Sequence, residues 1–388
     1  MLSPSVNNSD FHFSRFFRAV CFGSGGFASG QLPAIFQPAA SSGRNVSKLR
    51  TRLHLIWKTF LALTFSAALA GCQQSSSQDA EQRSTKPLQK ITVTYTFQPQ
   101  STLVHVAMAK GYFAEEGLDV QPMMRTFGKA SLQTVLDHQS DFATVAETPV
   151  MFNILKGENI FVIANIEAST TNNAVVGRRD AGLSVPGDLK GKRIGFIPGT
   201  TSDFFLDSLL TANGITRAEI RPVALQPDEM QNAIMMRKVD AVSIWNYPLA
   251  LINRQLGTNG VVFYDKELYT ETFNIACQQD FVKNNPETVK HFLRALLKAE
   301  KFVTEHADEA QSIMSASTKI DRNLIRDVWG NFHYQLELDQ MLLLTLEDET
   351  RWAMAHKLAA QAEMPDYRNY IYPDGLRAVK AEAVRMNR

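Results

Sequence analysis

The sequence predicts an α/β protein built from two successive α/β units and a helical C-terminal region. From Ile91 to Ile166, short runs rich in β-branched residues alternate with helical segments. Alternation of this kind predicts a mostly parallel sheet with helices on both faces. The pattern begins again at Ala174, which marks a second unit. Residues 286–360 have an almost wholly helical pattern, with Pro286 near a helix start.

The first unit is expected to alternate four strands with three helices. Its first strand reads Ile-Thr-Val-Thr-Tyr, a run of β-branched and aromatic residues typical of strands. We expect strands at 91–95, 118–120, 142–145 and 160–166, and helices at 103–112, 130–138 and 149–155.

The second unit opens with an extended run and a polar turn at 188–192. The turn at 198–202 then opens a helix over about 203–213, which Gly214 ends. We expect strands at 174–176, 193–197, 220–224, 241–244 and 261–264, with helices between them.

Residues 46–72 have the composition of a secretory signal peptide. Four basic residues (Lys48, Arg50, Arg52 and Lys58) precede an apolar run from 59 to 70. A charged region, a short apolar region and small residues at the cleavage point mark such a signal. The run is about half the roughly 20 apolar residues that a membrane span needs. The alternative is an ordinary buried apolar segment.

The end of this run, Leu-Ala-Gly-Cys at 69–72, resembles the lipobox of bacterial lipoproteins. The resemblance implies that residues 1–71 are removed and that Cys72 carries the lipid. The mature protein is then exported and anchored to a membrane on the periplasmic side of the cell envelope.

Residues 1–45 have no periodicity and include a Gly-rich stretch at 23–30. We predict that translation starts near Val46, from a non-ATG codon. A peptide from 1–45 detected in cells by mass spectrometry contradicts this prediction.

Composition limits what the mature protein does. Without residues 1–71, which hold seven basic side chains and one acidic, the 388-residue chain keeps 317 residues and a net charge of −5. That length suits two modest domains, and nothing in the charge indicates a nucleic-acid partner.

Of the three cysteines Cys21, Cys72 and Cys277, only Cys277 stays free, which excludes an intrachain disulfide. Residues 72–88 are rich in Ser and Gln and predict a flexible tether.

The strongest binding-site candidate is the turn that includes Thr200, Thr201 and Ser202. A strand followed by a Gly-containing turn and a helix places free backbone N–H groups at the positive end of the helix dipole. The three hydroxyls can bond the same anion. The alternative is that Thr201 or Ser202 only caps the helix, whose first turn already holds Asp203.

A second candidate is the strand end that carries Trp245 and Asn246. Ligands of α/β sheets usually bind at the carboxyl ends of the strands. The alternative is that Trp245 packs beneath the next helix, as large aromatic side chains often do.

Arrangements typical of catalysis or metal binding are missing from the sequence. The eight histidines are dispersed, without a zinc-binding spacing, and no nucleophile elbow is present. Glu115 and Glu116 are adjacent and predict solvated surface, while Cys277 lies in an apolar stretch and predicts an inert buried thiol. We therefore expect no enzyme activity, no metal and no cofactor.

Several segments, taken in order, resemble the substrate-binding proteins of bacterial ABC importers of the aliphatic sulfonate, nitrate and taurine type. Residues 110–120 are similar to that family's Lys-Gly-x-Phe-x-x-Glu-Gly-Leu-x-Val signature, and residues 188–195 to its Asp-Leu-Lys-Gly-Lys-x-Ile-Gly segment. Residues 239–242 with Trp245 and residues 364–367 also match. The resemblance covers about 89–375.

The resemblance implies a two-lobed periplasmic-binding-protein fold of type II, with two hinge crossovers and a ligand cleft between the lobes. Residues 89–170 and 275–388 would form one lobe, and residues 171–274 the other. Two departures stand out: Asn246 replaces a carboxylate that the family often has, and His138-Gln139-Ser140 replaces a segment with a Gly.

The implied protein is a lipid-anchored receptor, expected to be a monomer, that delivers a small anionic solute to an ABC permease and its ATPase. Lobe closure would trap the ligand. Thr200, Thr201 and Ser202 would hold the anionic head group, and Trp245 and Asn246 the ligand body. Further candidates, chosen by their position after strands or at helix starts, are Gln98, Phe127, Thr148, Ser169 and Thr170.

Three alternatives stay open. The ligand can be a neutral heterocycle such as a pyrimidine precursor of thiamin, which relatives with this fold carry. The chain can also be an enzyme of pyrimidine or menaquinone biosynthesis with the same fold. A receptor domain that signals rather than transports is the third alternative.

Overall fold

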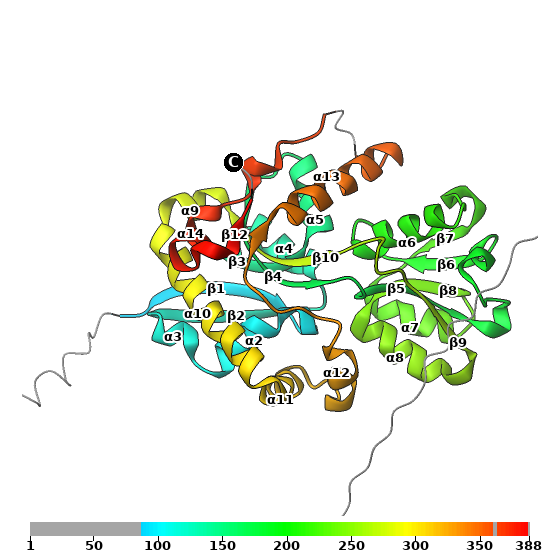
Figure 1. Ribbon diagram of the computed structural model, residues 1–388, viewed down its shortest axis with the longest axis horizontal. Helices are drawn as coiled ribbons and strands as arrows, with labels where there is room; N and C mark the ends of the chain where they lie inside the picture. Colours follow the sequence, from blue (N-terminus) through cyan, green and yellow to red (C-terminus); the bar gives the residue numbers. More distant parts are fainter. Residues whose placement is uncertain (1–86, 360–362, 387–388) are drawn as a thin grey trace, which may run out of the picture. The chain divides into compact units, whose positions relative to one another are not determined.

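The structure is a computed structural model that describes residues 87–359 and 363–386. These described residues cluster into one compact unit that contains two five-stranded sheets (Figure 1). The predicted signal peptide, Cys72 and most of the predicted tether lie outside the described residues.

In order across the first sheet, the strands are β2 (Leu118–Arg125), β1 (Gln89–Thr96), β3 (Phe142–Ala146), β10 (Glu271–Gln278) and β4 (Ile160–Ser169). In order across the second sheet, they are β7 (Arg221–Ala224), β6 (Arg193–Phe196), β8 (Ala241–Trp245), β5 (Asn173–Arg178) and β9 (Gly260–Phe263).

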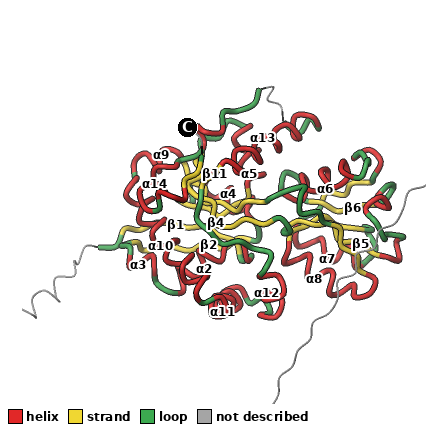
Figure 2. The backbone as a smooth tube through the Cα atoms, viewed as in Figure 1, coloured by secondary structure: helices red, strands yellow, loops and turns green. Residues whose placement is uncertain are grey.

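Helices cover both faces of the two sheets, so the strands run between helical layers in Figure 2. This arrangement confirms the predicted α/β class. We call each sheet with its helices a lobe. The helices of the first α/β unit are α2 (Thr102–Ala109), α3 (Tyr112–Glu115), α4 (Gly128–Leu136) and α5 (Glu147–Leu155). Those of the second are α6 (Thr201–Ala212), α7 (Pro227–Met235) and α8 (Asn246–Leu256).

The C-terminal region is mostly helical, as predicted, but a segment of about ten residues between two of its helices is extended and runs beside β4. A short ladder pairs β11 (Leu338–Asp339) with β12 (Val384–Arg385). None of the helices in the described residues has the length and apolar character that a membrane span requires. The helices of this region are α9 (Gln279–Asn284), α10 (Pro286–Glu305), α11 (Ala307–Thr318), α12 (Arg322–Trp329), α13 (Gln340–Ala355) and α14 (Pro373–Val379).

The chain crosses between the lobes twice, once from β4 to β5 and once from β9 to β10. β1, β2 and β3 are parallel, and so are β6, β7 and β8, as predicted. The strand that enters each lobe, β10 or β5, runs antiparallel to both of its neighbours. Each sheet is therefore mixed, with one reversed strand produced by a crossover.

The sequence analysis did not predict β10. Its residues 271–277 are all buried, so the strand lacks the alternation of buried and exposed positions that marks a strand with one wet face. β10 pairs with the first sheet from Glu271 onward, four residues before the lobe boundary expected at 274/275.

The core of the first lobe is continuous and apolar. Phe142 of β3 and Phe292 of α10 stack with their ring centroids 4.1 Å apart, and both are fully buried. Burying an aromatic side chain of this size contributes roughly 2–3 kcal/mol. Cys277 of β10 belongs to the same core, and burial raises the pKa of its thiol, as expected of an inert cysteine.

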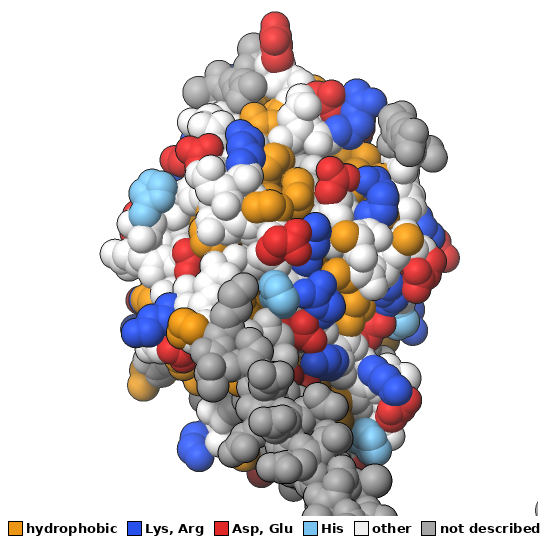
Figure 3. Space-filling model, turned by 90° about the vertical axis from the view of Figure 1, so that its left-hand side faces the viewer, with side chains coloured by type: hydrophobic (Ala, Val, Ile, Leu, Met, Phe, Trp, Pro, Cys, Tyr) orange, Lys and Arg blue, Asp and Glu red, His pale blue; other side chains and the backbone are white. Residues whose placement is uncertain are grey.

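One surface prediction was wrong. Glu116, at the end of α3, is not solvated: its side chain is 12% exposed and forms ion pairs with Arg294 and Lys298 of α10. Lys298 also pairs with Glu115. The face of the first lobe in Figure 3 accordingly mixes acidic and basic side chains.

The C-terminal helices also contact the second lobe. Trp352 of α13 donates from Nε1 to Oδ2 of Asp207 in α6 at 2.9 Å, and the ring of Trp352 packs edge-on against Phe204. On another side of the second lobe, α8 packs against α12. The first lobe is thus linked to the second by more than the two crossovers.

We expect Trp352→Phe to lower the melting temperature by about 2–6 °C. The substitution removes one hydrogen bond to a buried carboxylate, which contributes roughly 1–2 kcal/mol. Thermal unfolding followed by circular dichroism measures the change.

Trp329→Phe is the matched control, because it removes the same volume from a half-buried indole for which the structure records no hydrogen bond. Equal losses in the two variants contradict a specific contribution of the Trp352–Asp207 bond.

Candidate functional site

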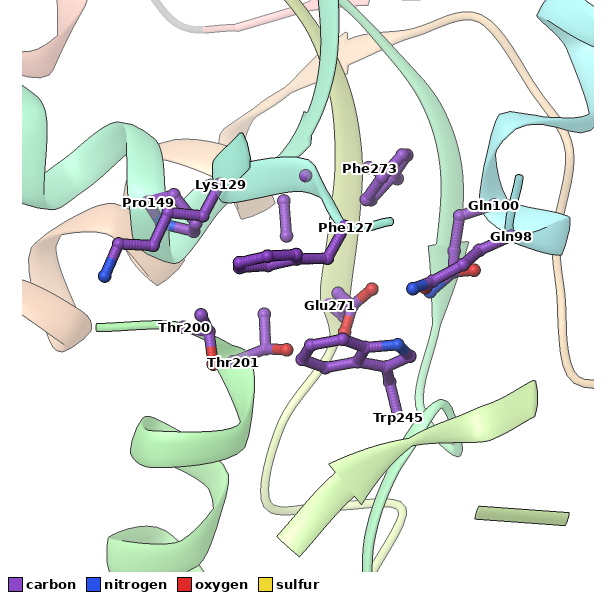
Figure 4. A pocket seen from close by; sticks show the side chains of 12 residues that line it. Gln98, Gln100, Phe127, Lys129, Pro149, Thr200, Thr201, Trp245, Glu271 and Phe273 are labelled. Atoms are coloured by element: carbon purple, nitrogen blue, oxygen red, sulfur yellow. The ribbon is translucent and has the colours of Figure 1, made fainter. Parts of the chain in front are cut away.

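A narrow cavity with a volume of about 20 Å³ lies between the two lobes. We call it the ligand cavity. Its walls come from loops and helix starts at the carboxyl ends of strands, where α/β folds bind ligands, and from the start of β10 (Figure 4). The residues that line it are Gln98, Gln100, Phe127, Gly128, Lys129, Ala146, Pro149, Thr200, Thr201, Trp245, Glu271 and Phe273.

Two aromatic rings face each other across this cavity. Phe127 precedes α4 in the first lobe and Trp245 ends β8 in the second, and their ring centroids are 6.3 Å apart at an interplanar angle of 17°. Gly128 brings α4 close to β3, since a Cβ at this residue would lie 3.0 Å from the Cα of Val145. The close packing of α4 therefore fixes the position of Phe127.

The indole N–H of Trp245 has no hydrogen-bond partner, although the side chain is 5% exposed. Figure 4 shows this nitrogen turned toward Gln98 and Gln100. A buried donor without a partner costs free energy that a bound acceptor recovers. The ligand cavity thus offers an unused donor to a ligand.

Glu271, the first residue of β10, is the carboxylate of the ligand cavity and is 1% exposed. Its Oε1 accepts a hydrogen bond from Asn172 Nδ2 at 2.7 Å, and its Oε2 accepts one from Asn173 Nδ2. Gln100 and Thr201 contribute further hydrogen bonds to the same carboxylate. Burial raises the pKa of Glu271, and these hydrogen bonds oppose the rise.

A second buried carboxylate, Glu147, stands at the first position of α5. The N–H of Thr272 donates to its Oε2 at 2.9 Å, and the hydroxyl of Tyr269 donates to its Oε1. Burial raises the pKa of Glu147 to about 8, and the nearby carboxylate of Glu271 adds to the rise. At neutral pH, Glu147 is therefore largely protonated.

The start of α6 differs from the prediction in detail. Thr200 is the N-cap residue, and its hydroxyl donates to the carbonyl of Ile197 at 2.7 Å. The hydroxyl of Ser202 donates to the carbonyl of Ser243. Asp203 accepts the N–H of Gly199, which has a φ of +67°. The hydroxyl cap that was the alternative to an anion site is absent from this helix start, and two of the three hydroxyls serve the fold.

Lys129 bridges the lobes at this end of the ligand cavity. Its Nζ donates to the carbonyl of Pro198 at 2.9 Å. Partial burial, followed by the nearby charge of Lys156, lowers the pKa of Lys129. The ligand cavity thus holds one cation and one carboxylate, on different walls.

The structure distributes the ten predicted ligand residues over several places. Gln98, Phe127, Thr200, Thr201 and Trp245 line the ligand cavity. Asn246 and Thr170 line a separate cavity beside the crossovers.

The other three bond within the protein. The hydroxyl of Thr148 donates to Glu349, that of Ser169 accepts the N–H of Thr171, and Ser202 is fully buried. These arrangements leave the ligand-binding role of all ten residues as a prediction.

Sequence reasoning missed Gln100, Lys129, Glu271 and Phe273. Glu271 and Phe273 lie on the strand that was not predicted, and no local pattern connects them to Trp245. Gln100 lies two residues after the predicted Gln98, and Lys129 lies two residues after Phe127. A search of every polar residue between a predicted strand and the next predicted helix would have included Gln100 and Lys129.

Two lobes joined by two crossovers, with a cavity between them, define the fold of periplasmic binding proteins. The chain belongs to the NMT1/THI5-like family, whose family model matches residues 98–310, more than half of the chain. The resemblance inferred from the motifs is confirmed at the level of family and fold.

The relatives of this chain are named for different ligands. A protein of Bacillus subtilis (strain 168), whose name describes aliphatic sulfonate binding, is 26% identical over 268 residues, which cover 68% of this chain and 79% of that protein. The formylaminopyrimidine-binding protein of Halalkalibacterium halodurans is 24% identical over 261 residues, 66% of this chain and 76% of that protein. The crystal structure of the periplasmic aliphatic sulphonate binding protein SsuA from Escherichia coli superposes with a TM-score of 0.66 at 15% identity, over 73% of this chain and 92% of that one.

The raised pKa of Glu147 predicts a pH-dependent stability. A buried neutral carboxyl stabilises the fold fully below its unfolded pKa of about 4.5, and this contribution is lost as the pH rises through about 8. From about pH 5 to about pH 9, the melting temperature should therefore fall roughly 5 °C more for the unaltered protein than for Glu147→Gln. Calorimetric scans at a series of pH values measure the difference.

Glu382→Gln, at an exposed site, is the control and should follow the unaltered protein. Parallel pH curves for Glu147→Gln and the unaltered protein would falsify the assignment of a neutral Glu147.

Proposed function

We propose that the protein is the substrate-binding component of an ABC importer and that it captures a small, flat, neutral heterocycle such as an aminopyrimidine. The observation that supports this choice is the facing aromatic pair of Phe127 and Trp245, with an unused indole N–H at its edge. Sequence analysis favoured an anionic solute and kept the heterocycle as an alternative. The geometry of the ligand cavity favours the heterocycle.

The spacing of the two rings suits a flat guest. Stacked carbon atoms lie about 3.5–4 Å apart, so a ring held between two others needs roughly 7 Å between them. The centroids of Phe127 and Trp245 are 6.3 Å apart, and they belong to different lobes. Because this distance is the upper limit of the spacing between the ring planes, the lobes have to open before a planar ring enters between them.

The polar groups suit a guest that both accepts and donates hydrogen bonds. Trp245 Nε1 needs an acceptor, such as a ring nitrogen or a carbonyl. The side-chain oxygens of Gln98 and Gln100 can accept from an exocyclic amino group. The buried carboxylate of Glu271 repels an anion, which weighs against a sulfonate placed between the rings.

A second candidate ligand is a small organic anion. It is favoured by the start of α6, where Thr200 and Thr201 line the ligand cavity, and by Lys129 on the opposite wall. The relative of Bacillus subtilis supports the same candidate. Only a small anion could bind at the end of the ligand cavity near α6 and Lys129 without approaching the carboxylate of Glu271.

The enzyme alternative has less support. Glu271 is the carboxylate that lines the ligand cavity, and it accepts hydrogen bonds from four amide or hydroxyl groups. No serine, cysteine or histidine is among the residues that line the ligand cavity, and the hydroxyl of Thr200 already donates to the carbonyl of Ile197. We therefore propose binding rather than catalysis.

In the proposed cycle, the ligand binds one lobe and contacts from the other stabilise the closed state. Delivery to a permease with its ATPase, anchoring through lipid on Cys72 and a monomeric state remain parts of the proposal. Native mass spectrometry of freshly purified protein should reveal a co-purified small molecule.

The proposal predicts that 4-amino-2-methylpyrimidine raises the melting temperature, whereas taurine and ethanesulfonate at equal concentration do not. Trp245→Phe keeps the stacking ring but removes the indole donor, so it should weaken pyrimidine binding about tenfold. Phe127→Leu removes one stacking face and should weaken binding to a similar extent. Isothermal titration measures both affinities.

Phe97→Leu is the matched control, because Phe97 lies beside the site without lining the ligand cavity and contacts Tyr247. Stabilisation by the sulfonates but not by the pyrimidine supports the second candidate instead. Flat melting curves with both classes contradict both.

A further inference from the structure

A second cavity lies beside the two crossovers, with a volume of about 360 Å³. We call it the hinge cavity. Thr170 and Thr171 of the first crossover line it, as do Tyr264 and Lys266 of the second. Asn246, at the start of α8, contributes a further wall. None of the residues that line the hinge cavity is among those that line the ligand cavity.

Asn246 is the residue that points to a ligand here. Its side chain is 3% exposed, and its Nδ2 has no hydrogen-bond partner. Its backbone N–H donates to Oδ1 of Asn172 at 3.2 Å, which holds the residue in place. A buried amide donor that lines a cavity and bonds nothing is satisfied when an acceptor enters.

The charged residues around the hinge cavity indicate which kind of hydrogen-bond acceptor can bind there. Lys266 is the charged residue that lines it, and no carboxylate residue does. Asp265 and Glu267 flank Lys266 in the sequence, but Oδ1 of Asp265 accepts the N–H of Glu267 and neither residue lines the hinge cavity. α8 is eleven residues long and begins at Asn246, so the positive end of its dipole faces the same space.

We propose that the hinge cavity is a second binding site, for a small oxyanion such as phosphate or sulfate. Nδ2 of Asn246 and Nζ of Lys266 donate to the anion, and the hydroxyls of Thr170 and Thr171 supply further donors. The anion bridges both crossovers with the start of α8.

The hinge cavity is connected to the ligand cavity by hydrogen bonds. Asn172 accepts from the N–H of Asn246 and donates from Nδ2 to Glu271, which lines the ligand cavity. Trp245, one residue before Asn246, lines the ligand cavity as well. Occupancy of the hinge cavity therefore favours one arrangement of the crossovers and changes the affinity of the ligand cavity, and this coupling is reciprocal.

Isothermal titration of the full mature chain with inorganic phosphate tests the site, at an ionic strength held constant with sodium chloride. We expect saturable binding below roughly 10 mM, since a site with a Kd near 1 mM is then almost full. Lys266→Gln should weaken it at least about tenfold, because a charge-assisted hydrogen bond is lost. Lys266 is exposed, so this variant should fold normally.

Two further lysine variants test whether the anion occupies the hinge cavity. Lys301→Gln makes the same change of charge at an exposed position of α10 and should leave phosphate binding unaltered. Lys129→Gln removes the cation of the ligand cavity and should weaken phosphate binding much less than Lys266→Gln does, because Lys129 does not line the hinge cavity. Asn246→Leu, checked for folding by circular dichroism, should weaken binding as Lys266→Gln does.

The outcomes are distinct from those that test the proposed function. Loss of phosphate binding in Lys129→Gln but not in Lys266→Gln places the anion in the ligand cavity and overturns the hinge site. Absence of saturable binding of both phosphate and sulfate also overturns it. Neither result bears on whether a pyrimidine binds between Phe127 and Trp245, because that measurement is made without phosphate.

Discussion

The hydrogen bonds of Glu271 to Asn172 and Asn173 are the interaction on which the arrangement of the lobes depends. Glu271 opens the strand that returns to the first sheet, and the two asparagines lie where the chain first leaves it. One carboxylate thus ties both crossovers together and also lines the ligand cavity. Because the tie is buried, its hydrogen bonds are stronger than they would be in water. The relative position of the lobes and the shape of the ligand cavity are set by the same group.

Several buried carboxylates surround this tie. Glu147 and Glu349 approach it from α5 and α13, and Glu167 on β4 has both oxygens buried without a hydrogen-bond partner. Burial, followed by the charges of neighbouring carboxylates, raises the pKa of Glu167 and Glu349. Raised pKa values favour the neutral forms of these carboxyl groups, and neutral carboxyl groups repel one another less than ionised ones do. The hinge region therefore gathers several acidic side chains whose ionisation is opposed by burial and by their neighbours.

Much of the fold could be predicted from the sequence, because local patterns determine it. β-branched runs and glycine-containing turns located the parallel strands, and the helix starts after them located Phe127, Thr200, Thr201 and Trp245 at the carboxyl ends of strands. Glu271 could not be found in this way. It depends on a strand buried on both faces, whose neighbours in the sheet lie about a hundred residues away in the sequence. Pairing between strands that are far apart in the sequence produces no periodic pattern in the sequence itself.

The contact of Trp352 with Asp207 and Phe204 has a consequence for the kinetics of exchange. In the proposed cycle, a ligand leaves the ligand cavity only when the lobes separate, and separation at α6 has to expose a buried carboxylate and an aromatic edge to water. The free energy of that exposure stabilises the closed arrangement, so it contributes to the barrier to opening and, equally for all ligands that bind this arrangement, to the apparent affinity. The residence time of a bound molecule is then governed partly by a helix that never touches it.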